Sequence, residues 1–151
     1  MPDKTKVFVD TSALFSGIWS AAGGARMILK LGEAGAISLL VSIQVLQESE
    51  RALRRKAPDS LASLALLLDR TSMSVVPAAS AETVTKCQAL IRHAGDALIL
   101  AATWESGADY LVALDRKHIL DNAALRTVSP FAIGTPGDFL AWYREHLVLP
   151  L

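Results

Sequence analysis

The segment Lys6-Val7-Phe8-Val9-Asp10-Thr11-Ser12 decides the fold, because a strand-like run leads there directly into an acid and two hydroxyl side chains. A short apolar run of this kind is typical of a buried strand. Asp, Thr and Ser are the residues that most often cap the start of a helix. The segment therefore predicts a strand over residues 6–9 and a helix over residues 13–19. A strand that passes into a helix is the repeating unit of an α/β protein.

The same alternation of strand and helix signals continues to the end of the chain. Further strands are predicted at residues 37–41, 73–76, 110–114 and 126–128. Thr135-Pro136-Gly137-Asp138 begins the last helix with an N-cap, a first-turn proline and an acid at the third helical position. No repeat or low-complexity linker interrupts the pattern. We therefore expect residues 1–151 to form a single α/β domain with a mostly parallel sheet of four to five strands.

Composition limits the class of protein. The chain is 52% hydrophobic and 20% charged, which fits a globular domain and argues against general disorder. No apolar run approaches the roughly 18 residues of a membrane span, and no export signal is visible at the N-terminus. The one cysteine, Cys87, cannot form an internal disulfide. We expect a cytoplasmic protein with no membrane partner, in which Cys87 is a small core residue.

Four acidic residues are the main candidates for function: Asp10, Glu48, Asp96 and Asp115. Asp10 and Asp115 directly follow predicted strands, where open α/β sheets gather their functional groups. Carboxylates that converge there repel one another, and a hard divalent ion such as Mg²⁺ or Mn²⁺ relieves that repulsion. Each acid also has a simpler explanation. The three aspartates are candidate helix N-caps, and Glu48 lies on a polar helix face.

Taken together, the segments that contain these acids resemble the successive acidic motifs of PIN domains. In chain order they are Val7-Phe8-Val9-Asp10-Thr11-Ser12, Ser42-Ile43-Gln44-Val45-Leu46-Gln47-Glu48, Gly95-Asp96-Ala97-Leu98-Ile99-Leu100-Ala101-Ala102 and Tyr110-Leu111-Val112-Ala113-Leu114-Asp115. The later segment Thr135-Pro136-Gly137-Asp138-Phe139-Leu140 is similar to the closing helix of the family. The resemblance implies a PIN-like three-layer α/β/α sandwich around the parallel sheet.

Membership of this family would imply a Mg²⁺- or Mn²⁺-dependent endoribonuclease, often a VapC-like toxin of a bacterial toxin–antitoxin pair. Carried over by motif, Asp10, Glu48, Asp96 and Asp115 become the catalytic and metal-binding set, and Ser12 matches a polar position near the first aspartate. One residue departs from the pattern. The family often has Thr or Ser two residues before the fourth acid, where this chain has Ala113. A hydroxyl that would support Asp115 is therefore missing.

Residues beside the acids are predicted to bind substrate. The predicted helix of Glu48 carries a basic cluster of Arg51, Arg54, Arg55 and Lys56, and Asp115 is directly followed by Arg116 and Lys117. These residues would hold RNA phosphates beside the metal. The alternative for them is a solvated charged face. His118 would touch substrate or lie on the surface. Trp19 would stack on a base, or pack in the core or in a subunit interface.

Three functions stay open at this stage. The first is the endoribonuclease, with RNA, an antitoxin protein and a second copy of the chain as partners. A homodimer is expected because the chain is hydrophobic for its size and has no net charge to keep copies apart. The second is a catalytically weak or inactive PIN-fold module that binds RNA or protein as a scaffold. The third is an aspartate-phosphorylated α/β protein, which ranks lowest because its Asp-x-Asp motif would need an acid at Ser12.

Overall fold

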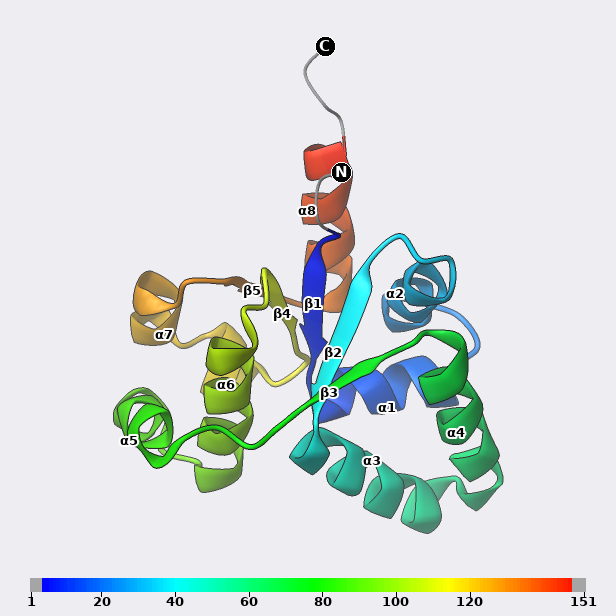
Figure 1. Cartoon of the computed structure of the whole chain (residues 1–151), viewed down its shortest axis with the longest axis horizontal. Coiled ribbons are helices and arrows are strands. Elements are labelled where there is room, and N and C mark those ends of the chain that lie inside the picture. The colour runs from blue at the N-terminus through cyan, green and yellow to red at the C-terminus, as the bar shows by residue number, and fades with distance from the viewer. Residues whose placement is uncertain (1–3, 148–151) are drawn as a thin grey trace.

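The computed structural model describes residues 4–147, which fold around one sheet of five parallel strands (Figure 1). The strand order is β3-β2-β1-β4-β5, so the first strand lies at the centre and the chain moves outward from it in both directions. In α/β sheets of this kind, a crevice opens where the strand order reverses, beyond the carboxyl ends of the strands. The strands are β1 Lys6–Val9, β2 Ser38–Ser42, β3 Ser74–Val76, β4 Tyr110–Val112 and β5 Ala132–Gly134.

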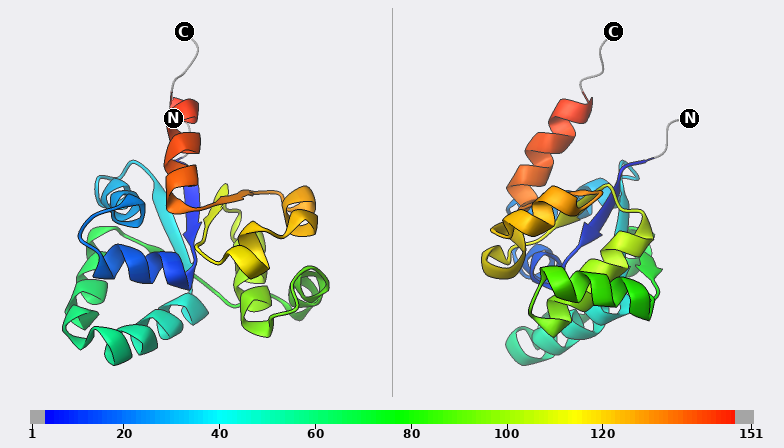
Figure 2. Two further views of the ribbon diagram at one scale, coloured as in Figure 1. Left: turned by 180° about the vertical axis from the view of Figure 1, so that it is seen from behind. Right: turned by 90° about the vertical axis from the view of Figure 1, so that its left-hand side faces the viewer.

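Helical segments connect the strands, because two neighbouring parallel strands need a crossover between them. Helix α8 lies on one side of the sheet together with α2, which it contacts, and the paired helices α5 and α6 cover the other side (Figure 2). The predicted three-layer sandwich is therefore confirmed. The helices are α1 Thr11–Trp19, α2 Gly24–Glu33, α3 Ile43–Lys56, α4 Leu61–Arg70, α5 Ala81–Leu90, α6 Ala94–Ser106, α7 Ala123–Val128 and α8 Pro136–Leu147, with a 3₁₀ turn at Pro58–Ser60 and a π-helical turn at Arg116–Leu120.

The core lies on both faces of the two central strands. Val7 and Phe8 of β1 and Leu111 and Val112 of β4 are completely buried, as continuous apolar runs in a covered parallel sheet should be. Cys87 is buried as predicted. None of the helices in the described part of the chain is long and apolar enough to cross a membrane.

One predicted strand was wrong. Residues 126–128 were expected to form a fifth strand, but they are the second half of α7, and the fifth strand is β5 at Ala132–Gly134. Asn122 caps α7 by accepting a hydrogen bond from the Leu125 amide at 3.0 Å, and three residues are too few to be assigned to strand or helix by periodicity alone. Trp19 is 59% exposed, so it does not pack in the core of the monomer.

Gly134 is required by close packing at the end of β5. A Cβ atom at this position would lie 2.7 Å from Asp138 Cβ and still closer to the Tyr110 hydroxyl. The next residues form the predicted helix start. Thr135 N–H donates to Asp138 Oδ2 and Asp138 N–H donates to Thr135 Oγ1, both at 3.0 Å, which is a reciprocal capping arrangement. It fixes the direction in which α8 leaves the sheet.

Candidate functional site

The structure brings the four acids together at the carboxyl edge of the sheet. Asp10 directly follows β1, and Asp115 follows the neighbouring strand β4. Glu48 lies in the second turn of α3, which begins where β2 ends, and Asp96 lies in the first turn of α6. All four line one cavity of about 330 Å³, together with Thr11, Ser12, Phe15, Ala52, Lys56 and Ile99.

Asp10 is the most buried of the four, with only 5% of its surface exposed. Its Oδ1 accepts a hydrogen bond from the Thr11 amide at 2.6 Å, and its Oδ2 accepts one from the Ser12 hydroxyl at 3.4 Å. Burial raises the pKa of Asp10 to about 7, and the charges of Asp96 and Glu48 add to the rise against the lowering effect of the Thr11 hydrogen bond. Asp10 is therefore both the N-cap of α1 and a member of the acidic cavity, so the two interpretations are compatible.

Glu48 is held between two neighbouring side chains. The Thr11 hydroxyl donates to Glu48 Oε2 and the Gln44 amide donates to Oε1, both at 3.4 Å. Gln44 also donates to the carbonyl oxygen of Gly95 at 3.2 Å. This contact joins the start of α3 to the start of α6, so the helices that carry Glu48 and Asp96 are fixed relative to each other.

The sequence suggested that Asp96 caps its helix, but the structure shows that it does not. Helix α6 begins at Ala94, and His93 is its N-cap, with His93 Nδ1 accepting a hydrogen bond from the Asp96 amide at 3.2 Å. Asp96 is thus the third helical residue, and its carboxylate is free to face the cavity. Burial raises the pKa of Asp96, while the neighbouring His93 lowers it and Asp115 raises it further.

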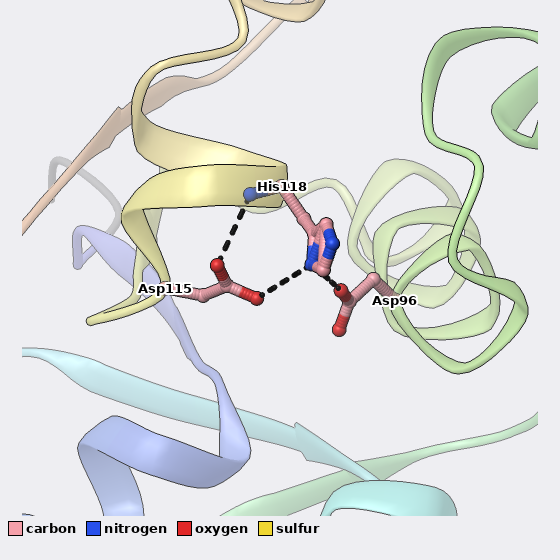
Figure 3. Close-up of side chains that lie close together, drawn as sticks. All are labelled: Asp96, Asp115 and His118. Atoms are coloured by element: carbon pink, nitrogen blue, oxygen red, sulfur yellow. Dashed lines mark hydrogen bonds and ion pairs between the residues drawn. The ribbon is translucent and has the colours of Figure 1, made fainter.

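His118 lies between Asp96 and Asp115 rather than on an open surface (Figure 3). Asp115 Oδ1 accepts a hydrogen bond from the His118 amide at 3.1 Å and so caps the π-helical turn. The Nδ1 atom of His118 lies 3.2 Å from Asp96 Oδ2 and 3.3 Å from Asp115 Oδ2. One nitrogen therefore faces the carboxylates of two separate elements, while about one third of the side chain stays exposed.

His93 is close to the same carboxylate but has a different role. Its Nδ1 lies 3.3 Å from Asp96 Oδ2, yet the same nitrogen accepts the Asp96 amide hydrogen bond. A nitrogen that accepts from an amide cannot also donate a proton to the carboxylate. We therefore assign His93 to the helix cap. Its ring stacks on that of His118, with the centroids 5.2 Å apart and the planes 18° from parallel.

Of the predicted basic residues, Lys56 lines the cavity and the arginines do not. Arg51, Arg55 and Arg116 are exposed and lie outside the cavity lining. At 100° per residue, Ala52 and Lys56 lie around α3 on one side of Glu48, whereas Arg51 and Arg55 lie on the other. Lys56 places its ammonium group 5.7 Å from the centroid of the Phe15 ring.

Two further cavity residues, Phe15 and Ala52, were not predicted, although each lies four residues after another cavity residue, Thr11 or Glu48. Gln44 contacts Glu48 within α3, and His93 contacts Asp96 at the start of α6, so these two contacts are also local in sequence. The hydrogen bond from Gln44 to Gly95 depends instead on the packing of α3 against α6. Ser12 lines the cavity, and its role in substrate binding stays a prediction.

The donor atoms at this site suit a hard cation. Carboxylate oxygens predominate, and burial raises the pKa values of Asp10 and Asp96, with neighbouring acids adding to the rise. One oxygen each of Asp96 and Asp115 and one nitrogen of His118 lie within 4.8 Å of one another. This carboxylate-lined cavity lies at the switch point of a parallel α/β sheet. It is therefore a candidate metal centre at the edge of the sheet.

Comparison with known proteins identifies the family. The sequence model of the PIN domain matches residues 6–117, about three quarters of the chain, and the chain therefore belongs to the PIN domain family. No curated protein sequence matches significantly.

Solved structures share the fold. A chain of VapBC2 from Rickettsia felis, crystallised with a DNA fragment from the promoter, is similar with a TM-score of 0.62 and 17% identity, over 87% of this chain and 98% of that one. VapC20 of Mycobacterium tuberculosis, a toxin that cleaves the sarcin–ricin loop, is similar with a TM-score of 0.54 and 21% identity, over 74% of this chain and 91% of that one.

Proposed function

We propose that this protein is a metal-dependent endoribonuclease that hydrolyses phosphodiester bonds of RNA. The observation that carries the proposal is the convergence of Asp10, Glu48, Asp96 and Asp115 on one cavity, with Asp10 almost completely buried. Four carboxylates in one cavity repel one another, so this arrangement costs free energy that a bound cation would return. The family supports the same reading, since the match covers the residues that contain all four acids.

Asp10, Glu48, Asp96 and Asp115 would hold Mg²⁺ or Mn²⁺. When bound, such an ion lowers the pKa of a coordinated water and stabilises the charge that develops on the phosphate in the transition state. The protein contributes orientation. Thr11 and Ser12 fix the Asp10 carboxylate, Gln44 fixes Glu48, and Lys56 would neutralise an RNA phosphate at the mouth of the cavity. Arg51, Arg55 and Arg116 would contact phosphates further along the strand.

Ala113 has no hydroxyl, but another residue supplies a hydroxyl group at the ends of the central strands. Ala113 is completely buried, and its amide donates to the Gly134 carbonyl at 3.0 Å. The Ser12 hydroxyl lies nearby instead, where it accepts a hydrogen bond from the Leu114 amide at 3.3 Å and donates to Asp10. Ser12 therefore supplies a hydroxyl that links the ends of β1 and β4, and this favours an active site over a catalytically inactive scaffold.

The biological setting that fits this activity is a cytoplasmic toxin of a toxin–antitoxin pair. VapC20, one of the similar structures, is described as a toxin that cleaves an RNA loop. We propose that the chain forms a single PIN-like domain over residues 1–151 and acts on RNA. An antitoxin protein and a second copy of the chain are its proposed protein partners. A single continuous hydrophobic core in the described residues supports the one-domain assignment.

RNA cleavage by substitution variants tests the proposal. Asp10→Asn and Asp96→Asn keep the side-chain shape but remove a charge that holds the ion, so each should lower the cleavage rate of single-stranded RNA in Mg²⁺ or Mn²⁺ by about 100-fold or more. Glu50→Gln is the matched control, because Glu50 is exposed on α3 and pairs with Arg54. Unchanged cleavage by both aspartate variants, or no metal-dependent cleavage by the wild type, would refute the proposal and leave an RNA- or protein-binding scaffold.

A further inference from the structure

The imidazole of His118 faces the acidic cluster from the π-helical turn. Its Nδ1 lies within 3.3 Å of carboxylate oxygens from both Asp96 and Asp115, which come from different elements of the fold (Figure 3). The side chain is one-third exposed, as is that of Asp115, so water and ions can reach both groups from the same side. The position of this ring is therefore part of the acidic site itself.

The surrounding structure fixes the imidazole in this position. The backbone amide of His118 donates to Asp115, and its carbonyl oxygen accepts a hydrogen bond from Asn122 at 3.3 Å. Asn122 also donates to the carbonyl oxygen of Leu90 at 2.9 Å, which connects the turn to α5. The His93 ring stacks against the His118 ring from the other side. A ring held by these contacts loses little further freedom when it binds an ion.

The spacing of the donor atoms matches that of neighbouring ligands around one ion. An octahedral ion with metal–ligand bonds of about 2.1 Å places adjacent ligand atoms about 3 Å apart. His118 Nδ1 lies 3.2 Å and 3.3 Å from the two carboxylate oxygens, which is close to that spacing. The imidazole nitrogen and the two carboxylate oxygens are therefore placed as adjacent ligands of one ion would be.

On the basis of the proposed function, we propose that His118 Nδ1 is a metal ligand together with Asp96 and Asp115, and that this mixed nitrogen–oxygen set selects Mn²⁺ over Mg²⁺. Carboxylates alone suit both ions, whereas an imidazole nitrogen binds transition-metal ions better than it binds Mg²⁺. His118 is thus the residue that sets metal preference. The competing role is a hydrogen-bond donor that only orients the two carboxylates.

Pulsed electron paramagnetic resonance of Mn²⁺ added to the full-length protein separates the two roles. A directly coordinated imidazole produces ¹⁴N modulation of the Mn²⁺ signal, which we expect for the wild type. His118→Asn retains a hydrogen-bond donor near the position of Nδ1 but has no imidazole, and His118→Ala removes both. The modulation should disappear in both variants. His146→Gln is the matched control, because it removes an exposed imidazole on α8.

Calorimetric titration gives a second readout. His118→Asn should weaken Mn²⁺ binding by about tenfold or more and Mg²⁺ binding by less than about threefold, so the preference for Mn²⁺ falls. Bound Mn²⁺ without ¹⁴N modulation in the wild type, or modulation that persists in His118→Asn, would overturn the ligand assignment. The wild-type spectrum decides the matter even if a variant does not fold.

Failure of the proposed function is a separate result. Modulation without any RNA cleavage would support the His118 assignment and refute the endoribonuclease. RNA cleavage with bound Mn²⁺ but no modulation would keep the endoribonuclease and refute the His118 assignment.

Discussion

Asp10 shows how one residue can cap a helix and still serve a functional site. Its Oδ1 satisfies the first amide of α1, and its charge lies in a cavity with three other acids. The pKa of about 7 shows that this position destabilises the charged carboxylate, with burial as the main cause. A helix cap alone would not need this burial, because caps at exposed helix ends provide the same hydrogen bond.

A pH dependence of stability follows for the metal-free protein. Asp10 has its ordinary pKa of 3.8 when unfolded and about 7 when folded, so between these values the folded state binds more protons and stability falls as pH rises. Between these two pKa values the free energy of unfolding falls by up to about 4 kcal/mol. Asp10→Asn has no charge to bury and keeps an oxygen acceptor for the Thr11 amide. It should therefore be more stable than the wild type at about pH 8 and similar at about pH 4.

Urea unfolding with chelator present, at several pH values, measures this difference. Asp69→Asn is the control, because Asp69 is exposed on α4. A stability difference between Asp10→Asn and the wild type that does not change with pH would contradict the assignment. Addition of Mn²⁺ should stabilise the wild type and not Asp10→Asn.

Ser49 gives a second prediction at the residue scale. Its hydroxyl on α3 is completely buried and has no hydrogen-bond partner among residues 4–147. Ser49→Ala removes this unsatisfied group and should raise the free energy of unfolding by about 1 kcal/mol. Ser63→Ala, an exposed serine on α4, reports the contribution of helix propensity alone. A Ser49→Ala variant less stable than the wild type would show that the hydroxyl has a favourable contact.

At the scale of elements, α3 and the start of α6 each contribute side chains to the acidic cavity. Helix α3 carries Glu48 and the basic residues, and Gln44 joins it to the first turn of α6. Only one of the basic side chains of α3, Lys56, lines the cavity. Fewer basic residues of α3 therefore face the acids than the basic cluster in the sequence contains.

RNA binding should reflect this geometry. In an Asp10→Asn background, which prevents cleavage, Lys56→Gln should weaken single-stranded RNA binding and lower the log–log salt slope by about 0.7. Arg51→Gln, Arg55→Gln and Arg116→Gln are predicted to act in the same direction where the strand continues beyond the cavity. Arg54→Gln is the control, since Arg54 pairs with Glu50 at 2.6 Å. A salt slope that Lys56→Gln does not alter would remove Lys56 from the substrate path.

At the scale of the whole molecule, large apolar side chains remain exposed on α1 and α4. Trp19 at the end of α1 is 59% exposed, and Leu66 on α4 is 50% exposed. Large apolar groups at the surface are frequent in subunit interfaces. The predicted homodimer therefore has a surface available to it on the described part of the chain.

Light scattering tests self-association. The wild type should have about twice the monomer mass of 16.1 kDa at micromolar concentration, and Trp19→Glu or Leu66→Glu should shift it toward the monomer. Val128→Glu, which introduces the same charge at an exposed position on α7, is the control. A wild-type mass near that of the monomer, unchanged on concentration, would defeat the homodimer.

The sequence by itself determined the order of most elements and identified the four acids that line one cavity. Helix caps and strand patterns depend on hydrogen bonds and burial within a few positions of the chain. Local sequence therefore specifies the strand before Asp10, the Ser42 cap of α3 and the Thr135–Asp138 cap of α8. The shortest predicted strand, at residues 126–128, was assigned wrongly, since three residues carry too little periodicity to separate strand from helix.

Only the tertiary structure decided how the acids are surrounded. His118 meets Asp96, Gln44 meets Gly95 and Lys56 meets Phe15 across elements that are far apart in the chain. These contacts depend on how helices pack against the sheet and on small rotations about each helix axis, which local sequence does not encode. The raised pKa of Asp10 has the same origin, because burial is a property of the assembled fold and not of the residue.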